Sequence, residues 1–195
     1  MNYGVAFFLN SILLGVGLAM DAFSVSLANG LYEPCMKKRK MCGIAGTFAF
    51  FQALMPMLGW ICVRTILRYL TFLESLIPWI AFALLGYIGG KMLQEGIQYK
   101  DVCPCERPGM GLAALLVQGL ATSIDALSVG FTITEYDFQA AFLEAMLIAV
   151  VTFVICIGGL MIGKKAGAKL AGKAGILGGT ILILIGLEIF ISSWV

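Results

Sequence analysis

Six long apolar runs set the strongest limit on how this chain can fold. The runs are 21 to 27 residues long, and a helix needs about 17 to 25 residues to cross a bilayer. The expected spans are Val5 to Leu31, Gly43 to Val63, Ile77 to Ile97, Gly109 to Ile133, Ala140 to Gly163 and Ala174 to Trp194. Charged residues make up only 12% of the chain, where a soluble domain has about a quarter. We therefore expect an all-α membrane protein with six transmembrane helices.

The charged and ionisable residues exclude several functional classes. Residues 1–30 contain no Lys or Arg, so the basic start of a signal peptide is missing and the first run should remain as a span. The chain has no histidine, which excludes metals and haems ligated by His and a His general base. The net charge of +2 is small, so we expect no nucleic acid as a partner. We expect neither an enzyme nor a bound cofactor.

The basic residues also predict how the spans are oriented. Eleven of the 13 Lys and Arg follow the first, third and fifth spans, and Arg64 and Arg68 lie on the other side. The positive-inside rule makes the first set cytoplasmic and places both termini outside. Glu144 then falls close to the outer interface, where we expect it to be solvated. Four cysteines fall in cytoplasmic loops, where we expect them to be reduced. A metal site formed by their thiolates is an alternative. The four are Cys35, Cys42, Cys103 and Cys105.

An aspartate motif occurs once in each half of the chain. Asp21 to Val25 reads Asp-Ala-Phe-Ser-Val, and Asp125 to Val129 reads Asp-Ala-Leu-Ser-Val. A carboxylate in hydrocarbon costs about 2.5 to 3.5 kcal/mol on insertion scales, so its retention indicates a function. Each half holds three spans, an odd number, so the second half enters the membrane in the opposite direction. We expect two inverted repeats, residues 1–100 and 101–195, with a site near the midplane between them.

Hydroxyl groups share a helix face with each aspartate. Ser24 follows Asp21 by three residues, and Thr122 and Ser128 flank Asp125 at the same spacing. Two carboxylates with hydroxyl and amide oxygens form a hard ligand set, which suits Mg, Ca or Mn better than Zn or Cu. The alternative is that the hydroxyls bond carbonyls of their own helices. The sequence thus predicts a divalent-cation site with oxygen ligands.

Further polar residues lie inside the apolar runs. Gln52, in the middle of the second span, is expected to be a ligand or gate residue, with interhelical packing as the alternative. Thr152 takes the matching place in the fifth span. Lys91 and Glu95 are four residues apart near the cytoplasmic end, where snorkelling and pairing explain them. The alternative is that Lys91 and Glu188, its counterpart in the second repeat, form two gates. The group of gating or supporting residues is Asn29, Lys91, Glu95, Thr152 and Glu188.

Five stretches carry a resemblance to a known family: Asp21 to Val25, Gln52 to Trp60, Trp79 to Phe82, Gly89 to Met92 and Ala121 to Ala126. They are similar to the bacterial manganese efflux pump family, MntP, within the lysine-exporter-like superfamily, over nearly the whole chain. The resemblance implies a six-helix exporter in the bacterial inner membrane, with Mn²⁺ as its transported substrate. It also implies that Asp21 and Asp125 serve transport. The chain departs from the family in its loop cysteines and in Gln52, where some members carry a carboxylate.

Four functions are compatible with these patterns. The first is a secondary transporter that exports Mn²⁺, driven by the membrane potential or by proton exchange. The second is a sporulation-associated or other-cation member of the same family. The third is an intramembrane aspartyl protease that uses Asp21 and Asp125, and the fourth is a scaffold without transport. The expected partners are Mn²⁺, a proton as counter-ion and the lipid bilayer, and a homodimer is left open.

Overall fold

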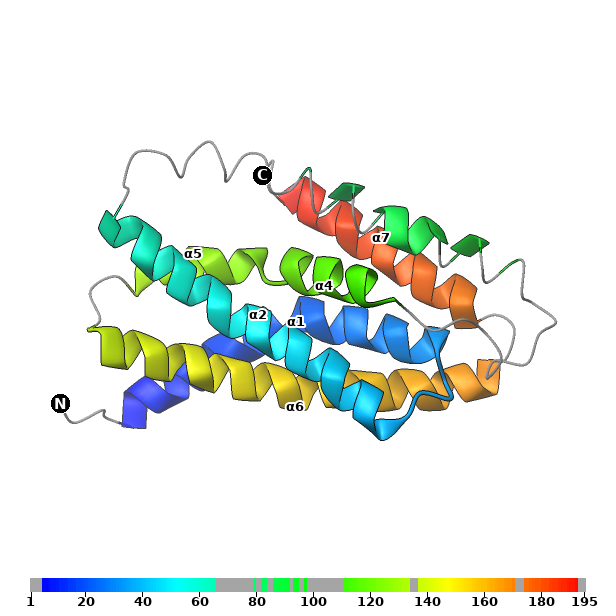
Figure 1. Ribbon diagram of the computed structural model, residues 1–195, viewed down its shortest axis with the longest axis horizontal. Coiled ribbons are helices and arrows are strands. Elements are labelled where there is room, and N and C mark those ends of the chain that lie inside the picture. The colour runs from blue at the N-terminus through cyan, green and yellow to red at the C-terminus, as the bar shows by residue number, and fades with distance from the viewer. Residues whose placement is uncertain are drawn as a thin grey trace.

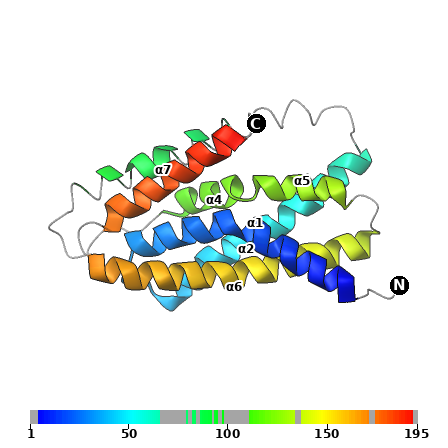
Figure 2. The ribbon, with the colours of Figure 1, turned by 180° about the vertical axis from the view of Figure 1, so that it is seen from behind.

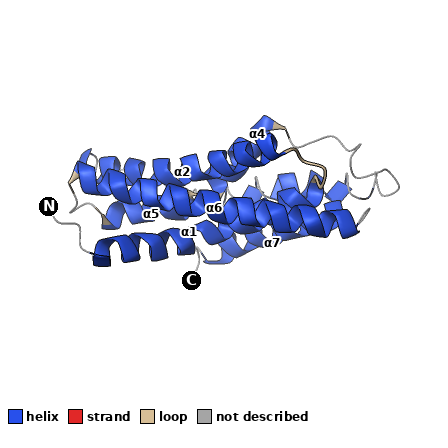
Figure 3. Ribbon diagram, turned by 90° about the horizontal axis from the view of Figure 1, so that it is seen from below, coloured by secondary structure: helices blue, strands red, loops and turns tan. Residues whose placement is uncertain are grey.

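The described part of the chain is helical throughout. The structure is a computed structural model that describes residues 5–65, 79, 82–83, 86–91, 93–94, 97, 111–133, 137–170 and 174–192. Coloured by secondary structure, this part shows helices joined by short loops (Figure 3). The helices are α1 (Val5–Tyr32), α2 (Lys38–Thr65), α4 (Leu112–Ala121), α5 (Ile124–Thr132), α6 (Phe138–Leu170) and α7 (Ala174–Ser192).

The lengths of these helices agree with the predicted membrane protein. Three segments are long and apolar enough to cross a bilayer: Phe7–Tyr32, Lys38–Cys62 and Phe138–Gly167. Helices α4 and α5 pass the same test together, as one bent span, and α7 contains a shorter apolar segment. The predicted span from Ile77 to Ile97 lies largely outside the described residues. The helical membrane protein is thus confirmed, whereas the count of six spans stays a prediction.

The distribution of side chains is that of a protein in lipid. Leu13, Phe50 and Val154 are each more than 60% exposed, whereas Gln52 and Thr152 have no exposed surface. A soluble protein would have to cover such apolar surface. In a bilayer the apolar side chains face the lipid, and the polar ones find partners only inside the bundle.

The longest contact in the bundle joins α1 to α6, which run parallel and side by side (Figure 1; seen from behind in Figure 2). Their backbones approach each other closely at Gly30 and Gly163, where a Cβ on Gly30 would lie 2.6 Å from the Leu160 carbonyl oxygen. Only glycine permits this approach. Helix α2 packs against both α5 and α6, and α7 packs against α1. Val25 and Phe48 lie in the core that α1, α2 and α6 enclose.

The run predicted as the fourth span forms two helices, α4 and α5, that meet at 43°. Thr122 and Ser123 separate them, and both hydroxyls bond to carbonyls of the preceding turn. Thr122 Oγ1 donates to Gln118 O at 2.9 Å, and Ser123 Oγ donates to Gly119 O at 2.7 Å. Such bonds compete with the regular helix pattern and bend the helix. The run predicted from Gly109 to Ile133 therefore contains a break, which lies directly before its aspartate.

Candidate functional site

The side chain of Gln52 joins the two aspartate motifs. Gln52 is buried on α2, and its Nε2 donates to Leu18 O of α1 and to Thr122 O at the α4–α5 break, both at 3.0 Å. Leu18 precedes Asp21 by three residues, and Thr122 precedes Asp125 by three. One amide group therefore binds the same position of both motifs and links α1 to the α4–α5 pair.

The helix break supplies the carbonyl that Gln52 binds in the second motif. In a continuous helix, Thr122 O would accept the N–H of Ala126. The Ala126 N–H donates instead to Asp125 Oδ1 at 2.9 Å. Asp125 lies in the first turn of α5, where the helix N-terminus favours a carboxylate. The break thus frees one carbonyl and fixes one carboxylate oxygen.

The carbonyl oxygen of the Gln52 side chain has no hydrogen-bond donor among the described residues. This atom, Oε1, is buried. A buried acceptor without a donor costs about 1 to 3 kcal/mol. An amide oxygen is also a ligand that Mg²⁺, Ca²⁺ and Mn²⁺ accept. The role of the Gln52 carbonyl oxygen as a cation ligand therefore stays a prediction, and its missing hydrogen bond is compatible with it.

The two carboxylates lie within electrostatic range of each other. Asp21 is half-buried on α1, whereas Asp125 on α5 is more exposed. Like charges at such range repel, and a divalent cation placed between them removes the repulsion. Within the described residues, no group of three or more Asp, Glu or Cys side chains could hold a metal. A cation at this point would therefore need neutral oxygens beside the two carboxylates.

The predicted hydroxyl ligands differ in how accessible they are. Ser24 is half-buried and Ser128 is exposed, each one turn beyond its aspartate. Thr122 is buried, and its hydroxyl donates to Gln118 O. For Thr122 the structure thus agrees with the alternative in which a hydroxyl bonds a carbonyl of its own helix. The hydroxyl oxygen can still accept a bond, because it acts as the donor in this one.

A buried amide pair lies on one side of the aspartates. Asn29 Nδ2 of α1 donates to Gln118 Oε1 of α4 at 2.8 Å, with both side chains buried. Asn29 belongs to the predicted supporting group, whereas Gln118 was not predicted, because its only sequence signal is an amide inside an apolar run. Thr152, also in the predicted group, is buried on α6, and its Oγ1 has no hydrogen-bond partner among the described residues.

The other predicted gate residues are described only in part. Lys91 is exposed. Glu95 lies outside the described residues, and Glu188 is placed only as a position within α7. Both the ion pair of Lys91 with Glu95 and the gates formed with Glu188 therefore stay predictions.

Glu144 is a buried carboxylate, so the expectation of a solvated side chain is wrong. It lies on α6 with 5% of its surface exposed, and its Oε2 has no hydrogen-bond partner among the described residues. Ile148 and Thr152 follow it at intervals of four residues and are both fully buried. The three residues share the face of α6 that is turned into the bundle. That spacing is the sequence signal that would have identified Glu144.

The loop cysteines do not form the expected set of reduced thiols. Cys35 is disulfide-bonded, whereas Cys42 is a free and exposed thiol. The expectation that Cys35 is reduced is therefore wrong. A sulfur already bonded to another sulfur is no thiolate, so Cys35 is not available to a metal site on this face.

Comparisons with known proteins agree on one family. The family model described as "Mntp: Putative manganese efflux pump" matches residues 35–190. "Putative manganese efflux pump MntP 2" of Clostridium botulinum (strain Hall) is 40% identical over 92% of this chain and 92% of its own length. Relatives named "Putative manganese efflux pump MntP" from Ruminiclostridium cellulolyticum and Maridesulfovibrio salexigens are 39% and 38% identical, over 92% and 94% of this chain and 93% and 98% of their own lengths. No solved structure matches the chain.

Proposed function

Because the chain belongs to the Mntp family, we propose that it is a secondary transporter that exports Mn²⁺ across the bacterial plasma membrane. One observation carries the site. The Gln52 amide bonds the carbonyls that precede Asp21 and Asp125 by three residues, and it leaves its own buried oxygen without a donor among the described residues. The proposed ligands are both carboxylates and Gln52 Oε1, with Ser24 and Ser128 completing the set.

Contacts between helices support an inverted repeat. A Cβ on Gly159 of α6 would lie 2.8 Å from Phe23 O of α1, and a Cβ on Gly59 of α2 would meet Leu127 O of α5. Phe23 and Leu127 each follow an aspartate by two residues. If each residue is replaced by its counterpart in the other half of the chain, the contact of Gly159 with Phe23 becomes the contact of Gly59 with Leu127. A two-fold axis in the membrane plane has this effect, and transporters with such repeats bind their substrate beside the axis.

The basic ends of the helices support the proposed orientation. Lys164 Nζ, near the end of α6, donates to Met36 O in the connection between α1 and α2 at 2.7 Å. The connections that follow the first and fifth spans, both expected in the cytoplasm, thus meet at one end of the bundle. We place this end in the cytoplasm and both termini outside.

The amide pair defines an inner barrier in the proposed cycle. Asn29 and Gln118 lie on the cytoplasmic side of the aspartates in this orientation, and their hydrogen bond joins α1 to α4. Mn²⁺ entering from the cytoplasm would require this bond to open. On the return step one of Asp21 and Asp125 takes up a proton, because two carboxylates without a cation between them repel each other.

Mn²⁺ flux in proteoliposomes tests the proposed site. Asp21→Asn and Asp125→Asn should each abolish flux, because one carboxylate cannot balance a divalent cation in the membrane. Asp137→Asn removes a carboxylate from an exposed position before α6 and should leave flux unchanged. A panel of Mn, Fe, Zn, Cd, Ca and Mg gives the preference of the wild-type protein. Full flux in either aspartate variant would rule out the shared site.

A further inference from the structure

A groove opens between the start of α2 and the end of α6. Its volume is about 500 Å³. Its walls include three large apolar side chains, Met41, Ile157 and Met161, and its basic residues are Lys38, Lys164 and Lys165. Met161 is 49% exposed, so the groove opens on the outer surface of the bundle. Apolar walls next to several cations match the two ends of a lipid molecule.

The positive charge in this groove is not neutralised by the described residues. Lys38 and Lys165 are exposed and have no ion-pair partner among them. Lys164 donates to Met36 O, which holds its ammonium group in place without compensating its charge. The groove therefore presents positive charge where the apolar surface of the bundle ends.

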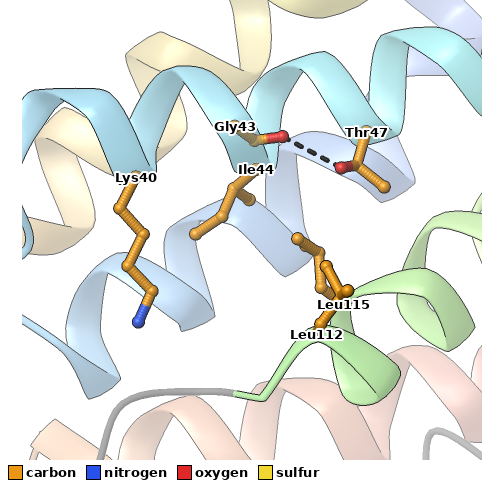
Figure 4. Close-up of a pocket in the computed structure, with 6 residues that line it drawn as sticks. All are labelled: Lys40, Gly43, Ile44, Thr47, Leu112 and Leu115. Atoms are coloured by element: carbon orange, nitrogen blue, oxygen red, sulfur yellow. Dashed lines mark hydrogen bonds between the residues drawn. The ribbon is translucent and has the colours of Figure 1, made fainter.

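A second groove, between α2 and α4, provides a contrast (Figure 4). It has a volume of about 310 Å³, and Lys40 is the one lysine among the described residues that line it. Lys40 forms an ion pair with Glu33. The hydroxyl of Thr47 is also committed, because it donates to Gly43 O at 2.9 Å. This groove lacks the uncompensated charge that an anion requires.

We propose that the groove between α2 and α6 binds one anionic phospholipid of the inner leaflet. Its phosphate contacts Lys38 and Lys165, and an acyl chain lies along Ile157 and Met161. A groove that opens sideways into a bilayer is filled by lipid, and basic pockets at the cytoplasmic side select anionic headgroups. The site is distinct from the cation site, and its occupant is a structural ligand rather than a substrate.

Native mass spectrometry of the full-length protein tests this site. The protein is titrated with phosphatidylglycerol and with phosphatidylcholine of the same acyl chains. Wild type should retain one phosphatidylglycerol in preference to phosphatidylcholine. Lys38→Gln with Lys165→Gln should weaken this binding about tenfold. The control, Lys37→Gln with Arg39→Gln, removes the same charge from exposed positions that do not line the groove, and it should bind as wild type does.

Two further measurements test whether the groove holds the acyl chain as well as the phosphate. Met161→Trp fills the groove and should reduce retention without changing any charge, and a thermal melt shows that each variant is folded. Soluble glycerol phosphate should not displace the lipid at equal concentration, since it lacks the chains that the apolar wall holds. Equal retention of both lipids, equal loss in the control pair, or displacement by glycerol phosphate would overturn the proposal.

Discussion

The two aspartate motifs have nearly the same sequence but different backbones. Asp21 lies within the continuous helix α1, whereas Asp125 lies in the first turn of a helix that begins at a break. The difference arises from two residues, because Leu18-Ala19 in the first motif is replaced by Thr122-Ser123 in the second. Both hydroxyls bond the preceding turn at the point where α4 and α5 separate, and such bonds bend helices. A repeat can therefore preserve its charged group while its backbone diverges.

The difference also assigns separate roles to the two motifs. A carboxylate on a continuous helix moves only with the whole helix, whereas one at the start of a short helix can move with that helix alone. Discontinuous helices line the substrate sites of many transporters. We therefore expect α1 to be the rigid side of the proposed cation site and α5 the adjustable side, with the Gln52 amide as the link between them.

Among variants that keep both aspartates, removing that link should have the largest effect. Gln52→Leu deletes the donor to two buried carbonyls and the free amide oxygen together. We expect Mn²⁺ flux in proteoliposomes to fall by about tenfold or more, equivalent to about 1.4 kcal/mol in the barrier. The thermal midpoint should also fall, because Leu18 O and Thr122 O lose their side-chain donor.

The matched control for this variant is Thr152→Val, at the position that the repeat aligns with Gln52. It removes a buried hydroxyl that has no partner among the described residues, so flux should change much less. Equal flux in Gln52→Leu and Thr152→Val would show that transport does not depend on the Gln52 amide. The proposed division into a rigid α1 and an adjustable α5 joined by that amide would then be wrong.

The sequence was sufficient for the features that follow from composition. The helical membrane protein follows from apolar length, and the buried place of Gln52 follows from a polar residue where lipid offers no partner. The roles of Asp21 and Asp125 in a cation site stay predictions. The break at Thr122 did not follow, because a hydroxyl in a helix can face its own carbonyls or a neighbouring helix. The burial of Glu144 did not follow either, since it depends on which face of α6 meets the bundle.

The glycines beside the two motifs should give the second largest effect. A Cβ on Gly59 would overlap Leu127 O directly, whereas one on Gly159 would lie 2.8 Å from Phe23 O. We expect Gly59→Ala to lower the free energy of unfolding by about 1 to 3 kcal/mol, and Gly159→Ala to lower it less. Thermal melts of the purified proteins in detergent measure both changes.

Gly43→Ala serves as the control for these two variants. A Cβ at this position of α2 meets no atom within 4 Å, so the helix propensity of alanine should stabilise the protein by up to about 1 kcal/mol. An equal loss of stability in all three variants would show that the contacts beside the motifs are not the cause.

The smallest expected effect comes from making one motif resemble the other. Thr122→Leu with Ser123→Ala gives the second motif the residues of the first and removes both hydroxyl bonds to the preceding turn. The helix should straighten, so that the Ala126 N–H donates to the carbonyl at position 122 and competes there with the Gln52 amide. We expect flux to fall about two- to fivefold, with an unchanged or higher thermal midpoint, because leucine and alanine are better helix formers.

The reverse exchange in α1, Leu18→Thr with Ala19→Ser, completes this experiment. It places the same two hydroxyls before Asp21, where helix α1 packs along α6, and a bend there would disturb that contact. The reverse pair should therefore lose stability, which the forward pair should not. If both exchanges left flux and stability unchanged, the break would be incidental to transport. A loss of flux without a loss of stability in the forward pair alone would identify the α4–α5 break as a part of the transport mechanism.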